Sequence, residues 1–232
     1  MEFPDDFNQL ELLNTHGDLI PRGGGSLWTG SEKEEEGVEE EEEEDHSEEW
    51  YLENEETLKG KPRELVLWAA ENNRLSTLHR LLPADPALVH CRDEDGYTPL
   101  HRAAYGGHVD AVSALLSAGS KVNPRTIDGW TPLHSACRWS RAAVASLLLR
   151  HGAELNAQTN GGLTPLHLAA SHASSFKSDS ASTLELLLSQ RHLKHWLCSS
   201  AGETAGEVAR RSGPHHFLFE MVDDCVNVTP VS

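Results

Sequence analysis

Hydrophobic and polar positions along the chain repeat with a spacing of 33 residues. The stretch DGYTPLHRAAYGG begins at Asp95, DGWTPLHSACRWS at Asp128 and GGLTPLHLAASHA at Gly161. Each copy places a leucine and a pair of small residues at helical spacing, and a second apolar run follows further on. A unit of this length cannot bury its apolar face alone, so the pattern predicts an array of small helical units that stack on one another.

Each copy predicts two helices. In the copy at 128–160, Thr131 is the expected N-cap of the first helix, and Pro132 follows at the first helical position, where a missing amide hydrogen costs nothing. Leu133 is expected to point inward, and the later run VASLLL predicts the second helix. Gly152 suits the left-handed residue that follows a helix.

Weaker copies flank the three clear ones. Residues 64–82, ELVLWAAENNRLSTLHRLL, keep the small pair but lack TPLH, and GETAGEVARR from Gly202 keeps the capping Thr204. In that last copy Gly206 replaces the buried leucine, which predicts an intrinsically weak helix. The spacing from Thr164 to Thr204 is 40 residues, and most of the extra residues fall in HASSFKSDSAS, which predicts a protruding loop.

Charge divides the chain into two parts. Residues 1–60 hold 21 Asp and Glu against 3 Lys and Arg, whereas residues 61–232 hold 16 against 16, so the net charge of −18 lies in the first part. Between Glu32 and Glu49, 13 of 18 residues are acidic. Such a run repels itself and buries little apolar surface, so we expect it to be disordered. It acts either as a solvated spacer or as a mimic of nucleic-acid phosphate that attracts basic proteins such as histones.

The predicted organisation follows from these patterns. It consists of a disordered acidic region at 1–60, a degenerate repeat at 61–94, repeats at 95–127 and 128–160, a repeat with a loop insertion at 161–200, and a C-terminal capping repeat and tail at 201–232.

A short amphipathic motif is predicted at 5–21, in the segment DDFNQLELLNTHGDLIP. Phe7, Leu10 and Leu13 recur every three residues beside acidic neighbours. This spacing favours a short helix that folds into the groove of a partner. Docking on the protein's own repeats is the alternative.

His134 and Cys137 lie three residues apart, as a nucleophile and its base or two metal ligands could. The sister copies carry Ala104 and Ala170 at the position of Cys137, whereas the histidine recurs as His101 and His167. A catalytic pair would not have alanine in place of its cysteine in the two sister copies, so we interpret both residues as structural.

No other catalytic or metal-binding pattern is recognised, so we expect a non-enzymatic protein without cofactor or metal. The chain has no phosphate-binding glycine loop, nucleophile elbow or CxxC spacing. Its four cysteines and lack of a signal peptide predict reduced thiols in an intracellular protein. No apolar stretch is long enough to span a membrane. Neutral repeats beside a polyanionic segment argue against direct binding of nucleic acid.

These motifs resemble the ankyrin repeat family, in which a period of about 33 residues contains TPLH. The resemblance implies an all-α solenoid of helix-turn-helix units with short β-turn fingers, whose fingers and first helices form a concave protein-binding face. Carried over to this chain, the finger positions are Glu94, Tyr97, Ile127, Trp130, Asn160 and Leu163, and the first-helix positions are Tyr105, Arg138, Trp139 and His172. Aromatic residues and Arg often dominate binding energy. Trp139 is the sharpest candidate, because its sister position holds Gly106.

Longer segments, among them FNQLELLNTHGDLIP, LWAAENNRL and DGWTPLHSACRW, are similar to one member of this family. That resemblance implies an adaptor that acts in the nucleus, with the cytoplasm as a second location, and is linked to transcriptional regulation and differentiation. We expect a monomer that binds one or more proteins.

Overall fold

The computed structural model describes residues 47–172 and 178–220. The motif with Phe7, Leu10 and Leu13, most of the acidic run and residues 173–177 of the predicted loop insertion lie outside these residues. His172 and residues 178–182 are helical, so the prediction of a loop over the whole stretch HASSFKSDSAS is wrong for them. Within the described ranges the secondary structure is helical, apart from one isolated antiparallel bridge between Cys198 and Thr204. The predicted all-α class is confirmed.

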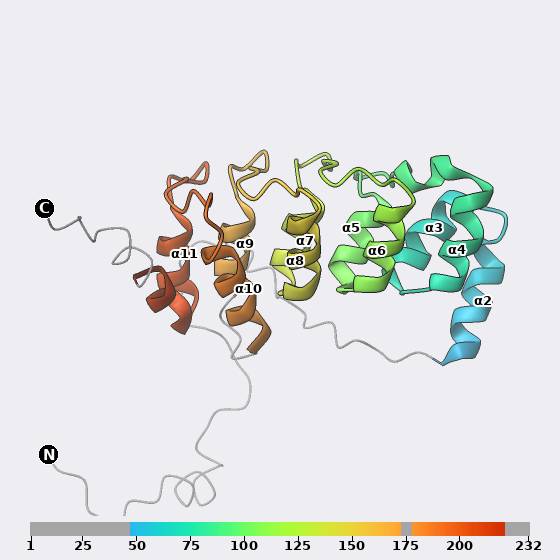
Figure 1. Cartoon of the computed structure of the whole chain (residues 1–232), viewed down its shortest axis with the longest axis horizontal. Helices are drawn as coiled ribbons and strands as arrows, with labels where there is room; N and C mark the ends of the chain where they lie inside the picture. The colour runs from blue at the N-terminus through green and yellow to red at the C-terminus, as the bar shows by residue number, and fades with distance from the viewer. Residues whose placement is uncertain (1–46, 173–177, 221–232) are drawn as a thin grey trace, which may run out of the picture. The chain divides into compact units, whose positions relative to one another are not determined.

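Five units each begin with a first helix, and four of them continue into a second (Figure 1). The first helices are α3 (Pro62–Glu71), α5 (Pro99–Gly106), α7 (Pro132–Arg138), α9 (Pro165–His172) and α11 (Ala205–Ser212). The second helices are α4 (Leu75–Ala84), α6 (Val109–Ser117), α8 (Ala142–Arg150) and α10 (Ser178–Leu188). Short 3-10 helices, η2 (Pro86–His90) and η3 (Pro214–His216), follow α4 and α11.

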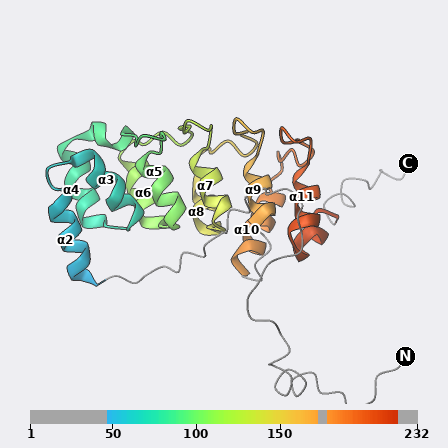
Figure 2. The ribbon, with the colours of Figure 1, turned by 180° about the vertical axis from the view of Figure 1, so that it is seen from behind.

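The helices form two rows. Each first helix packs against the first helix of the next unit, and the second helices α4, α6, α8 and α10 pack in the same order. The loops that join successive units, called fingers below, lie along one edge of the rows in both views (Figures 1 and 2). None of the described helices is both long enough and apolar enough to cross a bilayer.

The core lies between the rows and is continuous from unit to unit. Leu100 and Leu133 are fully buried and Leu166 nearly so, and the small pairs on the same helices are buried beside them. Small side chains let neighbouring first helices approach closely. The left-handed residue predicted after the second helix is confirmed at Gly152, with φ +88°.

The closing unit is completed by a residue that the repeat pattern does not contain. α11 begins after Thr204, as predicted, and a Cβ added at Gly206 would lie 3.4 Å from Cδ1 of Phe219. Phe219 is buried. The aromatic ring therefore packs where the repeat pattern has a leucine, and this contact supports a helix that is weak by itself.

An additional helix, α2 (Glu48–Leu58), precedes the first repeat. The prediction that disorder extends to residue 60 is therefore wrong for residues 48–58. Trp50 and Tyr51 pack against Trp68 of α3, with ring centroids 6.3 and 6.1 Å apart. The sequence of α2 is dominated by glutamate, so the contacts that hold it become visible only in the tertiary structure.

Arg74 forms the polar part of this contact. Its guanidinium donates to both oxygens of Glu48 at 2.7 and 2.9 Å and to Glu55 at 3.1 Å, and it lies 5.1 Å from the centroid of the Tyr51 ring. The side chains of Arg74 and Glu55 are only 17% and 16% exposed. The carboxylates raise the pKa of Arg74 above its usual value, because they hydrogen-bond to the charged form.

α2 takes the place of the first helix of a missing repeat. Arg74, His108 and Arg141 occupy the same position, just before the second helix of their units. His108 Nε2 donates to Glu71 O at 2.7 Å, and Arg141 Nε donates to Tyr105 O at 3.2 Å, so both side chains reach the end of the preceding first helix. Arg74 reaches α2 in the same way.

The α2 contact predicts that Arg74→Gln lowers the free energy of unfolding by roughly 1.5–3 kcal/mol, the usual contribution of hydrogen bonds to charged groups. Urea denaturation measures the change. Lys59→Gln is the control, because Lys59 pairs with Glu56 in an exposed pair; it should change stability by less than about 0.5 kcal/mol. Equal effects of the two substitutions would contradict the role assigned to Arg74 in holding α2 on the stack.

The core predicts that alanine substitutions at two residues of α7 lower the free energy of unfolding by different amounts. Leu133→Ala should cost about 2–5 kcal/mol, because the cavity lies in a fully buried layer. Cys137→Ala should cost roughly 1 kcal/mol, since alanine already stands at this position in the sister repeats. Thermal or urea unfolding of both variants distinguishes the two. A Cys137→Ala protein that folds normally but loses partner binding would refute the structural interpretation of Cys137.

Candidate protein-binding surface

Backbone hydrogen bonds fix the fingertips to one another. The N–H groups of Ile127, Asn160 and Ser200 donate to the carbonyl oxygens of Asp95, Asp128 and Gly161, respectively, each at 2.9 Å. The three bonds repeat at equivalent points of successive fingers. The fingertips therefore form a continuous edge whose backbone is already ordered.

A second ladder of side chains runs through the fingers. Arg92 Nη1 donates to Arg125 O at 2.6 Å, Arg125 Nη1 donates to Gln158 O at 2.7 Å, and Gln158 Nε2 donates to Cys198 O at 3.2 Å. Each of these side chains also reaches a glycine carbonyl in its own finger. The two arginines thus direct their donors into the fingers.

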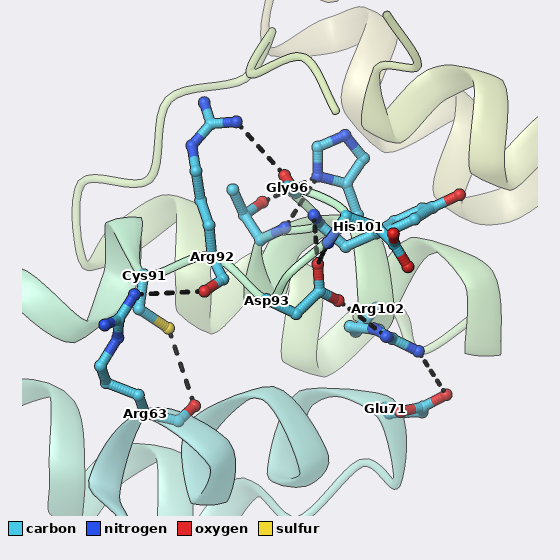
Figure 3. A network of polar contacts seen from close by, with 11 residues as sticks. Arg63, Glu71, Cys91, Arg92, Asp93, Gly96, His101 and Arg102 are labelled. Carbon is cyan, nitrogen blue, oxygen red and sulfur yellow. Dashed lines mark hydrogen bonds and ion pairs between the residues drawn. The ribbon is translucent and has the colours of Figure 1, made fainter. Parts of the chain in front are cut away.

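Asp93 organises the first complete finger (Figure 3). Its Oδ1 accepts hydrogen bonds from the backbone N–H of Tyr97 at 2.8 Å and of Asp95 at 3.1 Å, and its Oδ2 pairs with Arg102 at 2.7 Å. Arg102 also reaches Glu71 of the preceding unit at 3.3 Å. Its guanidinium lies 5.3 Å from the centroid of the Tyr97 ring. Tyr97 is therefore held by a network that spans two repeats.

Tyr105, Arg138 and Trp139 form a cluster at the ends of α5 and α7. The rings of Tyr105 and Trp139 meet edge to face with centroids 5.0 Å apart, and the guanidinium of Arg138 lies 5.6 Å from the centroid of a Trp139 ring. All three side chains are partly exposed. Trp139 thus packs on the neighbouring repeat, a contact that Gly106 at the sister position could not make.

The predicted surface residues differ in how exposed their side chains are. Glu94, Ile127 and Asn160 are exposed. The partly buried residues are Tyr97, Tyr105, Trp130, Arg138, Trp139 and Leu163. Asn160 has a structural task, since its Nδ2 donates to Ile127 O at 2.9 Å. His172 is the last residue of α9, and its side chain lies outside the described residues. The repeat pattern did not mark Asp93, Asp95, Arg102 or Asp128 as site residues, although each stands at a repeated finger or helix position.

His134 and Cys137 do not form a reactive pair. His134 Nδ1 accepts from the N–H of Thr131 at 3.1 Å, and Nε2 donates to Leu163 O in the next unit at 3.1 Å. Cys137 is fully buried, and this burial raises the pKa of its thiol far above the usual range.

The same arrangement recurs in the neighbouring repeats. His101 bonds to Thr98 N and Trp130 O, and His167 bonds to Thr164 N and Glu203 O. These partners require the neutral ring with its proton on Nε2. Burial lowers the pKa of His101 and of His134 to about 4 and also lowers the pKa of His167.

The paired helices, the TPLH caps and the ladder of fingers define an ankyrin-repeat protein, a class of protein-interaction scaffold. A family profile described as ankyrin repeats (3 copies) matches residues 66–159. Over 232 residues the chain is 58% identical to ankyrin repeat domain-containing protein 49 of Bos taurus and 56% identical to that of Homo sapiens. Both alignments cover 100% of this chain and 93% of the relative.

A protein of the same name in Drosophila melanogaster is 40% identical over 65 residues, which is 28% of this chain and 30% of that protein. The similarity thus spans the whole chain in the mammalian relatives and about a quarter of it in the insect protein. The chain belongs to the ankyrin repeat family.

The buried histidines predict a loss of stability in mild acid. In the unfolded chain His101 and His134 bind protons near pH 6.5, whereas in the folded state burial lowers their pKa to about 4. Because the unfolded state binds more protons in this window, stability is complete above pH 6.5 and falls toward pH 4. Each histidine contributes up to about 1.4 kcal/mol per pH unit.

Urea denaturation between pH 7 and 5 tests this dependence. His134→Gln should reduce the slope of stability against pH by about one proton, whereas His151→Gln, at an exposed position, should leave it unchanged. A slope unaffected by His134→Gln would contradict the assignment of a neutral, bridging histidine.

Proposed function

We propose that the protein is a non-enzymatic adaptor that binds a protein partner on the surface formed by its fingers and the ends of its first helices. The Tyr105–Arg138–Trp139 cluster is the observation that carries this proposal. It combines two aromatic rings and an arginine from adjacent repeats, held together before any partner arrives. Such side chains contribute most to binding when a partner removes them from water.

The acidic run supports a second candidate function, the capture of basic proteins. The run from Glu32 to Glu49 carries 13 acidic residues. Its end is Glu48 and Glu49 at the start of α2, where Glu48 already pairs with Arg74. Attraction by the remaining charges would be long-range and sensitive to salt.

Location and biological process stay predictions. The nuclear location and the link to transcriptional regulation and differentiation rest on the resemblance of the sequence to one member of the family. The monomeric state and the absence of direct nucleic-acid binding are likewise expectations from the sequence.

The cluster predicts the effect of one substitution. Trp139→Ala should weaken the affinity for a partner captured by the full chain by about 5- to 30-fold, which corresponds to roughly 1–2 kcal/mol. The loss of affinity caused by Trp139→Ala should be similar at 0.05 and 0.5 M salt, since this contact is desolvated. Calorimetry with the purified partner provides the measurement.

Trp196→Ala is the matched control, because Trp196 is 60% exposed and lies in the loop before α11. Both variants are first checked for unchanged unfolding midpoints. Normal affinity of a folded Trp139→Ala protein, combined with loss of binding when residues 32–46 are removed and α2 is kept, would favour the acidic run over the cluster.

A further inference from the structure

The fingertips of the repeats at 95–127 and 128–160 present carboxylates around an apolar side chain. The fingertip surface is defined here by Glu94, Asp95, Ile127 and Asp128, with Tyr97 behind them. All four fingertip side chains are exposed, and Ile127 is 68% exposed, the largest value among the exposed large hydrophobic residues of the described chain. An isoleucine this exposed, between two aspartates, has no role in the core.

The cations of these fingers are engaged elsewhere. Arg92 and Arg125 donate to backbone carbonyls inside the finger ladder, and Arg102 pairs with Asp93 and Glu71. Among the described residues, no ion pair is formed by Glu94, Asp95 or Asp128. Arg92 and Arg125 keep their charge, but their donors point into the ladder, and Arg125 also pairs with Glu154 at 3.3 Å. Asp93 is thus paired inside the fingers, whereas Glu94, Asp95 and Asp128 are exposed without a salt bridge to the described part of the chain.

The surface is also ordered in advance. The N–H of Ile127 bonds to Asp95 O, and its carbonyl accepts from Asn160 Nδ2, so its backbone is tied to the fingers on both sides. A partner that covers Ile127 therefore loses little binding free energy to the ordering of this backbone. Asp95 and Asp128 come from adjacent fingers, and both act on the Tyr97 hydroxyl, where their charges add to the effect of burial in raising its pKa.

The acidic character is local. The fingertip positions that follow along the stack are Asn160, Gly161 and Ser200, which carry no charge. The field of the fingertips therefore falls off toward the C-terminal repeats, and a charged partner segment would be held in one orientation.

Resting on the proposed function, we infer that the partner segment bound at the fingertip surface is an extended basic polypeptide of another protein. Its Lys or Arg side chains lie against Asp95 and Asp128, and an apolar side chain between them covers Ile127. In an extended segment every second residue faces the same side, so cationic and apolar residues at alternate positions of one face match this surface.

The chain offers a direct reporter, because it contains only two isoleucines, Ile20 and Ile127. Full-length protein with labelled isoleucine methyl groups gives one NMR signal from the N-terminal region and one from the fingertip. The probe is a capped peptide of three Arg-Ser-Leu-Ser repeats, which places Arg and Leu alternately on one face. Three Glu-Ser-Leu-Ser repeats form the control peptide.

The basic peptide should shift the Ile127 signal in a saturable manner at 0.05 M salt, and the acidic peptide should not. Asp95→Asn combined with Asp128→Asn should weaken this binding at least about fivefold. The matched control, Asp110→Asn combined with Glu185→Gln, removes two charges from exposed positions of α6 and α10 and should leave the affinity unchanged.

Three results would overturn the inference: a shift confined to Ile20, an equal response to both peptides, or equal losses in the two double variants. The adaptor proposal fails separately. If Trp139→Ala abolishes partner binding while the basic peptide leaves Ile127 unshifted, the adaptor function stands and the basic partner segment does not.

Discussion

The structure depends on one buried histidine, with a hydrogen bond on each ring nitrogen, that is repeated from unit to unit. Each buried TPLH histidine accepts from the cap of its own first helix and donates to a carbonyl of the following unit, as His134 does between Thr131 and Leu163. One ring therefore sets the start of a helix and the position of the next finger together. Since a single unit buries too little apolar surface to fold alone, this coupling makes local helices into a cooperative stack. It also occupies both nitrogens of a buried ring, which leaves no free nitrogen for acid–base chemistry.

At the two ends of the stack there is no further repeat for the histidine coupling to join, and other groups take its place. In the last unit Glu207 stands at the histidine position, and its carboxylate accepts from Thr204 N at 2.7 Å. Glu207 caps its helix and needs no next unit, so an exposed charged group suffices there. At the other end α2 replaces a missing first helix, with Arg74 bound to carboxylates where His108 and Arg141 bind backbone carbonyls. The C-terminal end is thus capped by an exposed carboxylate, and the N-terminal end by a mostly buried arginine paired with carboxylates.

The same coupling shapes the surface available to partners. Because the fingers are tied together through their backbones and through Arg92, Arg125 and Gln158, their tips hold a fixed spacing without help from a ligand. Side chains at the tips are then free to vary in chemistry without loss of the fold. Here the first tips carry acidic groups around Ile127, and the nearby helix ends carry aromatic residues. A rigid framework with a variable edge is the physical basis for protein recognition by this chain.

The sequence by itself determined where the first helices of the three clear repeats begin and which of their leucines are buried, because the 33-residue period, the Thr-Pro caps and the leucines are local and recur in register. It also predicted that Cys137 is structural, since the sister copies replace it with alanine. Only the tertiary structure decided that residues 48–58 form a helix. That helix is held by Trp68 and Arg74, which are distant in the sequence, whereas charge composition alone predicted disorder. Likewise, the network of Asp93 and Arg102, the packing of Trp139 on Tyr105 and the commitment of Asn160 to Ile127 join different repeats. Contacts of that kind depend on how the repeats stack in space, and the order of residues along the chain does not specify that geometry.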